Sequence, residues 1–383
     1  MHSWIRSLLP ACVGVLSGLA ADEFLPLFNG RDLTGWVNVN CAPDTWRATN
    51  GVIFCTGKPT GELRTTRMYQ NFILELEWRH LQPKGNSGVF VWADALTARG
   101  QPFIRAVELQ VLDGQEGDWF TSDGDVFPIH GARMTPVNGR GGDRAFPTEK
   151  RMKPSPEWNH YRVECIDGAI AHAVNGKVVT RGHDVSPRKG YICLEAEGSP
   201  IEFRNLRIKE LPGARALPPA DIADPDDDFL PLYTGADLSG WVDSPEVRAA
   251  WRVDDWTLRC GGRPDAPPLA YSRELGDGGL IIDWRWADAK NAGDWTQLVR
   301  LRGIDLAPLL RTRPADAPKL ELEPGNWNRA RFDFRGQSLK VTVNGTPWGS
   351  PLTLTNAPAI GTLSLQSPAA PAQVGNLFWK RLD

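Results

Sequence analysis

Apolar and polar residues alternate along many short segments of this chain. In the segment ILELEWRH at 73–80, Leu74, Leu76 and Trp78 alternate with charged residues. Because neighbouring side chains of a strand point to opposite faces of a sheet, this alternation predicts a strand with one apolar and one charged face. Similar alternation is found in VELQVLDG at 107–114, HYRVECIDG at 160–168 and YICLEAEG at 191–198. The pattern predicts a structure built from short strands.

Turn signals separate these segments. Asp167-Gly168 and Asn175-Gly176 stand between alternating runs, and such pairs favour two-residue hairpin turns. The chain has 38 glycines, 31 prolines and 16 tryptophans, which suits short strands and tight turns better than long helices. We therefore expect an all-β fold of the sandwich type.

The chain contains an internal repeat. FLPLFNGRDLTGW at 24–36 returns as FLPLYTGADLSGW at 229–241, and EWNHYRVECIDGAIAHAVNGKVV at 157–179 resembles NWNRARFDFRGQSLKVTVNGTPW at 326–348. The displacement falls from 205 residues in the first pair to 169 in the second. The second copy therefore lacks about forty residues that the first copy has between Gln110 and Glu157.

The repeat predicts two domains, at 22–211 and 229–383, because a repeat unit is usually one structural unit. The segment 212–228 is rich in proline and acid and is expected to be a short solvated linker. Residues 1–21 combine Arg6, an apolar stretch and small residues, which indicates a signal peptide. A membrane anchor is the alternative, but the stretch is shorter than the ~20 apolar residues of a span. We expect export to the periplasm or the extracellular space.

Charge and cysteine content narrow the partners. The formal net charge is −3 with acids and bases interspersed, which argues against binding to nucleic acid or to an anionic membrane surface. No motif indicates a metal or another cofactor, and none is expected. The oligomeric state is left open. Beyond the leader an odd number of cysteines remains, mostly expected as buried, apolar side chains: Cys41, Cys55, Cys165, Cys193 and Cys260.

Several of these segments together resemble one known family. They are LFNGRDLTGW, NFILELEWRH, GNSGVFVW, VELQVLDG, SPEWNHYRVECIDGAIAHAVNGK and GYICLEAEGSPIEFRNLRIKEL, in this order within residues 24–211. They are similar to the 3-keto-disaccharide hydrolase family. The resemblance implies a concanavalin A-like jelly roll whose concave face binds sugar, in proteins that cleave a glycoside carrying a ketone at C3. The expected fold is thus all-β, with two tandem concanavalin A-like jelly-roll β-sandwich domains.

The polar residues of the first copy supply candidates for an active site on this concave face. Glu108 and Gln110 share one face of their strand. His130 lies in the insertion that the second copy lacks, and catalytic groups are often found on loops held by a rigid scaffold. The catalytic candidates are Glu108, His130 and Asp113, and the expected substrate-binding residues are Glu77, Arg79, Asn86, Ser87, Gln110 and Glu195.

Each candidate also has a structural interpretation. Charged residues such as Glu77 and Arg79 can form a solvated face with cross-strand ion pairs worth about 0 to 1 kcal/mol. Asp113 precedes a glycine, where aspartate commonly forms a turn, and a lone histidine is more often structural than catalytic. The family usually has glutamine at the position of Glu195, which should point to the same side as Glu197.

The second copy is expected to have no catalytic activity. The repeat alignment places Asp283 opposite Glu75, Arg285 in place of Glu77 and Ala287 in place of Arg79. It also leaves the strand of Glu108 without a clear counterpart. A role in binding or in completing the fold is the remaining interpretation of this copy.

The chemistry of a 3-keto glycoside needs only an acid and a base. The ketone acidifies the C2 proton, so a base can remove it while the group at C1 leaves, and water adds afterwards. Glu108 or His130 would be the base, and the other group or Asp113 the acid. Direct hydrolysis is the alternative. We expect an exported hydrolase or lyase acting on an oligosaccharide or glycoside. A non-catalytic carbohydrate-binding or scaffold protein is the rival hypothesis, because jelly rolls serve both purposes.

Overall fold

A computed structural model describes residues 23–113, 122–314 and 317–382. The expected signal peptide at 1–21 lies outside these residues. The described chain consists mainly of antiparallel strands with two short α-helices, α1 (Pro245–Ala250) and α2 (Ala307–Leu310). Three 3-10 turns are also present: η1 (Pro219–Asp221), η2 (Ala289–Asn291) and η3 (Trp295–Gln297). Within the described residues, no helix is long and apolar enough to cross a membrane. The predicted all-β class is confirmed.

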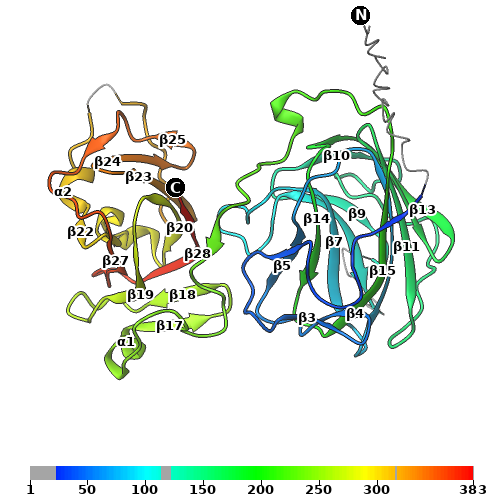
Figure 1. The fold of residues 1–383 in the computed structure, drawn as a ribbon, viewed down its shortest axis with the longest axis horizontal. Coiled ribbons are helices and arrows are strands. Elements are labelled where there is room, and N and C mark those ends of the chain that lie inside the picture. The colour runs from blue at the N-terminus through cyan, green and yellow to red at the C-terminus, as the bar shows by residue number, and fades with distance from the viewer. Residues whose placement is uncertain (1–22, 114–121, 315–316, 383) are drawn as a thin grey trace, which may run out of the picture.

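The N-terminal half contains two sheets. In spatial order, sheet A consists of β10 (Arg133–Pro136), β13 (Lys177–Ser186), β12 (Ala169–Val174), β11 (Asn159–Ile166), β6 (Phe72–His80), β15 (Ile201–Glu210), β4 (Val52–Cys55) and β3 (Trp46–Thr49), with β1 (Leu25–Pro26) beside β15. Sheet B consists of β2 (Trp36–Asn38), β5 (Gly61–Thr65), β14 (Tyr191–Ala196), β7 (Asn86–Ala93), β8 (Ala106–Leu112) and β9 (Val126–Ile129). The two sheets form the larger lobe in Figure 1.

The core of this half lies between the two sheets. Leu74, Leu76 and Trp78 of β6 are buried in one apolar cluster with Val89 of β7 and Leu109 of β8. The alternation along β6 therefore has the predicted consequence, since its apolar side chains all face inward.

The predicted hairpins are confirmed. Asp167-Gly168 joins β11 to β12 and Asn175-Gly176 joins β12 to β13, and all four residues have positive φ, between 46° and 86°. Two consecutive positive φ angles are the signature of the hairpin turn that such pairs favour.

The C-terminal half also contains two sheets. Sheet C consists of β17 (Trp251–Asp254), β18 (Thr257–Cys260), β28 (Ala372–Arg381), β20 (Gly278–Trp286), β23 (Asn328–Arg335), β24 (Ser338–Val343) and β25 (Thr346–Pro347), with β16 (Leu230–Pro231) on β28 and β26 (Leu352–Thr353) on β24. Sheet D consists of β19 (Leu269–Leu275), β27 (Gly361–Leu365), β21 (Val299–Leu301) and β22 (Ile304–Asp305). From β17 to β24, sheet C has the same strand order as sheet A from β3 to β12.

The register of the strands corrects the alignment of the two copies around β6. Trp78 pairs with Asn159 in sheet A, and Trp284 pairs with Asn328 in sheet C. Trp284 is therefore the counterpart of Trp78, which puts Asp283 at the position of Glu77 and Arg285 at that of Arg79. The predicted correspondence was wrong by two residues.

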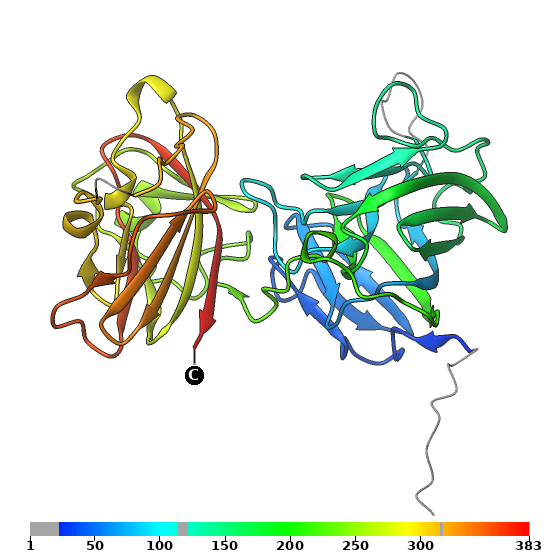
Figure 2. The same cartoon turned by 90° about the horizontal axis from the view of Figure 1, so that it is seen from above.

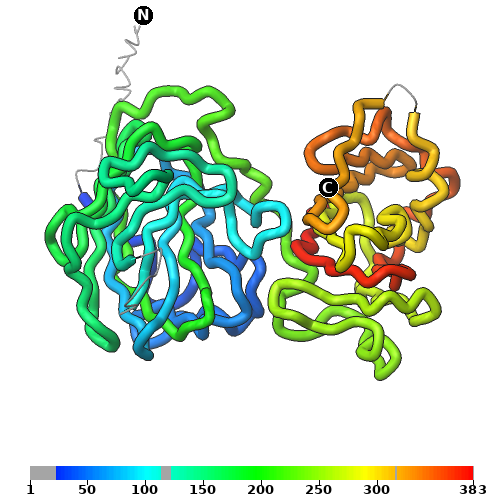
Figure 3. The backbone as a smooth tube through the Cα atoms, turned by 180° about the vertical axis from the view of Figure 1, so that it is seen from behind, coloured from blue at the N-terminus to red at the C-terminus, as the bar shows by residue number. Residues whose placement is uncertain are grey.

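The two halves meet at a buried junction. The segment 94–104, which follows β7, reaches across to the outward face of sheet C (Figure 3). There the fully buried carboxylate of Asp283 accepts hydrogen bonds from the backbone N–H of Gly100 at 2.7 Å, from Arg329 at 2.6 Å and from Asn376 at 2.8 Å. Figure 2 shows the halves as two bodies that meet along one side.

Apolar side chains complete this junction. Phe229, Ile281 and Phe378 of the C-terminal half belong to one buried cluster with Phe90 and Ala106 of sheet B. Because Phe90 and Ala106 lie on the outward face of sheet B, the C-terminal half packs at one end of that face.

The segment between the copies is not simply a solvated linker. Ala223 is buried, and Asp221 forms an ion pair with Arg188 at 2.9 Å. Asp227 accepts a hydrogen bond from the hydroxyl of Tyr191 at 2.9 Å. The prediction of a solvated linker therefore needs correction, because these contacts attach the segment to the first half.

Candidate active site

Four carboxyl groups gather on the outward face of sheet B. Glu62 of β5, Glu195 of β14 and Glu108 of β8 are 0%, 2% and 7% exposed. Glu197, directly after β14, is half-buried. They form one row because Glu62 pairs with Glu195 in the register of β5 and β14, and β7 joins β14 to β8.

Gly88 of β7 lies between two of these groups. A Cβ atom added there would be 2.9 Å from an oxygen of Glu195 and 3.0 Å from an oxygen of Glu108. Both carboxyl groups therefore reach the same point above the strand. The ring of Phe90 is also 2.9 Å from that point, so there is no room for a side chain above Gly88 and the two acid groups lie close together there.

A chain of hydrogen bonds positions the row. The Gln110 side-chain amide donates to the Asn86 side-chain oxygen at 2.7 Å, and the Asn86 amide in turn donates to Glu197. Glu197 also shares a hydrogen bond with Glu195. The sequence prediction that Glu195 and Glu197 point to the same side is confirmed, and Asn86, Gln110 and Glu195 belong to the same cluster as Glu108.

Burial raises the pKa values of these acids. Burial first, and then the charge of Glu197, raises the pKa of Glu108 to about 8, against the opposing charge of Arg144. Burial and the charge of Glu108 raise the pKa of Glu195 well above its usual value, and burial raises that of Glu197. Neighbouring buried carboxyl groups cannot all ionise together, because desolvation and repulsion both favour the neutral form. The cluster therefore holds protons near neutral pH.

Asp113 and His130 lie beyond the two ends of this cluster. Asp113 follows β8 and accepts a hydrogen bond from the backbone N–H of Ser155 at 3.2 Å. His130 follows β9 with a φ of 52°, and its ring stacks on Phe103 with 6.4 Å between ring centroids. Burial lowers the pKa of His130. Within the described residues, neither side chain forms a hydrogen bond or an ion pair with Glu108.

Glu77 and Arg79 do not belong to this cluster. Both lie on the outward face of sheet A, on the opposite side of the sandwich from the outward face of sheet B. Glu77 pairs with Arg204 at 2.6 Å, and Arg79 pairs with Glu202 at 2.7 Å. The solvated, ion-paired interpretation of this strand describes them. Ser87 also points away, donating its hydroxyl to the backbone oxygen of Glu195 at 2.7 Å.

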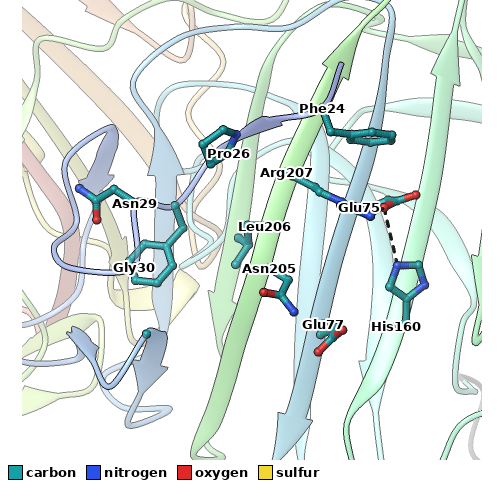
Figure 4. Close-up of a pocket in the computed structure, with 12 residues that line it drawn as sticks. Phe24, Pro26, Asn29, Gly30, Glu75, Glu77, His160, Asn205, Leu206 and Arg207 are labelled. Carbon is teal, nitrogen blue, oxygen red and sulfur yellow. Dashed lines mark hydrogen bonds and ion pairs between the residues drawn. The ribbon is translucent and has the colours of Figure 1, made fainter. Parts of the chain in front are cut away.

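Glu77 instead lines a cavity of about 430 Å³ on sheet A, with Glu75, His160 and Asn205 (Figure 4). Glu75 lies between Arg162 and Arg207, at 2.7 and 2.5 Å. The acids of this cavity are thus neutralised by arginines, unlike those on sheet B.

Three members of the sheet B site were missed by the sequence analysis as candidates. Glu62 accepts a hydrogen bond from the backbone N–H of Ile104 at 2.7 Å, and Glu197 accepts one from Asn86. Arg144 lies over the ring of Phe127, 3.4 Å from its centroid, and acts on Glu108 by its charge. Glu197 could have been found from its alternation with Glu195, whereas Arg144 comes from the insertion and depends on tertiary contacts.

The second copy retains little of this row. By strand register and by sequence, the positions of Glu62, Glu195, Glu197 and Glu108 are taken by Pro268, Gln366, Pro368 and Asp305. Asp305 lies in the two-residue strand β22, which stands where β8 stands in the first half, and it is exposed. Only one carboxyl group remains, without a buried partner.

No metal site is found among the residues that the structure describes, where no group of three or more His, Cys, Asp or Glu side chains could hold an ion. The five cysteines beyond the leader are all buried and free. Their predicted role as small buried side chains is confirmed.

Residues 23–209 match the family described as the 3-keto-alpha-glucoside-1,2-lyase-like domain. This part of the chain belongs to that family, which indicates a carbohydrate hydrolase-like function.

Individual relatives are more distant. A 3-keto-disaccharide hydrolase of Bacteroides thetaiotaomicron is 25% identical, over 50% of this chain and 79% of its own length. Two solved structures described as candidate glycosyl hydrolases of Parabacteroides distasonis are 25% and 26% identical, with TM-scores of 0.40 and 0.37. Each covers 50% of this chain, and the matches cover 95% and 100% of those chains.

Proposed function

We propose that the N-terminal half cleaves glycosides that carry a ketone at C3, with the neighbouring acids Glu108 and Glu195 on sheet B as the reaction centre. The observation that carries this proposal is the approach of Glu108 and Glu195 to one point above Gly88, with both pKa values raised. The family membership of residues 23–209 and the activity for which the Bacteroides relative is named support the same substrate class.

Glu108 is the proposed base. A pKa of about 8 makes its carboxylate a far stronger base than an ordinary glutamate, and a catalytic pKa near the working pH is favourable. Glu108 takes the C2 proton, the electron pair forms an enolate with the C3 ketone, and the C1–O bond breaks. Arg144 acts on Glu108 by its positive charge, and the same charge favours the negative charge that develops on the enolate.

Glu195 is the proposed acid. One of its oxygens is buried and has no hydrogen-bond partner, and it is this oxygen that reaches the point above Gly88. Because burial keeps the group protonated, it can give its proton to the leaving oxygen. Water then adds across the C1–C2 double bond and restores the 3-keto sugar.

This assignment predicts the pH dependence of the reaction. The active form of Glu108 is ionised, so kcat/KM should rise about tenfold per pH unit below pH 8 and level off above it. The measurement is kcat/KM for a 3-keto-β-glucoside between pH 5 and 10. A rate that falls as the pH rises through 8 would show that the protonated form of Glu108 is the active one.

We further propose that the protein is exported to the periplasm or the extracellular space, and that 22–211 is the catalytic domain while 229–383 has a binding or structural role. The leader-like residues 1–21 and the absence of the carboxyl row from the second copy support this division. Mass measurement of the protein from a secretion-competent host tests the leader, since an uncleaved Met1 would count against export.

A further inference from the structure

Three arginines lie in one row across the outward face of sheet C. Arg252 of β17 pairs with Arg259 of β18, Arg259 pairs with Gln373 of β28, and Gln373 pairs with Arg285 of β20. Directly paired side chains on one sheet face are near neighbours, and like charges in that arrangement repel each other. The row therefore concentrates positive charge at a cost to stability.

Few acidic side chains balance the positive charge of this row. Arg259 forms one ion pair with Asp254 at 2.5 Å, while Arg285 donates to the side-chain oxygen of the neutral Gln373. Within the described residues, the guanidinium of Arg252 forms neither a hydrogen bond nor an ion pair. An unpaired arginine offers its full fork of donors to an incoming anion.

The first half shows that the fold does not need this charge. The corresponding row in sheet A is Arg47, Phe54, Glu202 and Arg79, by the same strand pairings. There Arg47 lies over the ring of Phe54 and Arg79 pairs with Glu202. The second half has arginine where the first has phenylalanine, and glutamine where the first has glutamate. The first difference adds a positive charge and the second removes a negative one, so both make the net charge of the row more positive.

The row lines a cavity of about 570 Å³, whose walls include Arg252, Arg259, Arg285, Gln373 and Trp286. We propose that this cavity, the arginine groove, binds an acidic saccharide through its carboxylate or sulfate group. Guanidinium groups recognise both anions through paired N–H donors. The preference for an anion is inferred from the groove alone. That the anion belongs to a saccharide rests on the proposed function of the first half.

The full-length protein is the material for the test, by calorimetric titration at low ionic strength. The probes are tetragalacturonate, which carries carboxylates, a sulfated heparin tetrasaccharide, and neutral cellotetraose. We expect at least one anionic probe to bind, to weaken as salt is added, and to bind more tightly than cellotetraose. The stronger of the two anionic probes identifies the carboxylate or the sulfate as the preferred group.

Arg252→Gln and Arg259→Gln should each weaken anion binding roughly tenfold, the effect of losing a charged hydrogen bond. Arg248→Gln is the matched control, because Arg248 is an exposed arginine of α1 that pairs with Asp243 and does not line the groove. Unchanged affinity in both groove variants would overturn the proposal, as would equal binding of cellotetraose. If inorganic sulfate bound as tightly as the oligosaccharides, the inference that the ligand is a saccharide would be overturned.

The same titration with Glu108→Gln separates this proposal from the proposed function. Glu108 lies in sheet B, far along the chain from the groove strands, so this variant should bind the anionic probe as the wild type does. Loss of binding there would contradict a site in the second half. A protein that binds the anion but never turns over a 3-keto glycoside would refute the enzyme and leave the anion site standing.

Discussion

Glu108→Gln should lower kcat for a 3-keto glycoside by about 10² to 10⁴, the range expected when a positioned acid or base is lost. The amide has the same shape as the carboxyl group and cannot accept the C2 proton. Because the group is mostly protonated in the folded protein near neutral pH, the neutral amide should fit the buried site, and stability should hold or improve. Kinetics and a thermal melt on the same preparation measure both effects.

Glu77→Gln is the matched control for this experiment. Glu77 is also a strand glutamate, but it lies on the outward face of sheet A and pairs with Arg204. Its replacement should leave kcat within about twofold, because surface changes away from a site have small effects. If the Glu77 variant were as impaired as the Glu108 variant, the assignment of the reaction to sheet B would be contradicted.

Asp283→Ala should lower the free energy of unfolding by about 3 to 5 kcal/mol, the usual cost of removing one partner of a buried ion pair. The change leaves Arg329 without its carboxylate and the backbone N–H of Gly100 without its acceptor, at the junction of the halves. Urea denaturation of the full-length protein measures the loss.

Asp305→Ala provides the comparison for this variant. Asp305 is exposed, lies 3.9 Å from Arg300 and accepts a hydrogen bond from the backbone N–H of Ala307 at 3.0 Å, so its removal should cost only about 1 kcal/mol. If both variants lose the same small amount, the junction contributes little and the two halves are independent in stability.

The strands, the hairpins and the inward-facing residues of this fold could be predicted from the sequence, because each follows from local alternation and turn chemistry. The correct alignment of β6 with β20 could not be predicted in this way. A shift of two residues keeps every side chain on the same face, so alternation cannot reveal it. Only the pairing of Trp78 with Asn159 and of Trp284 with Asn328 reveals it.

The candidate site was predictable to a similar extent. Alternation places Glu108, Gln110 and Glu195 on one face of their strands, and the structure brings these three residues together. Alternation cannot tell which sheet carries that face, so Glu77 and Arg79 were grouped with them although they belong to sheet A. The burial of Glu62 and the position of Arg144 depend on contacts between distant segments, which no local pattern records.

The most direct test of the central claim is the reaction of the wild-type protein with a 3-keto-β-glucoside in D₂O, followed by ¹H NMR. The account predicts release of the group at C1 and a free 3-keto sugar with deuterium at C2 in a single stereochemical position. The deuterium is expected because a solvent proton replaces the one that Glu108 removes. A folded protein that leaves the substrate intact, or that releases sugar without deuterium at C2 beyond a no-enzyme control, would contradict it.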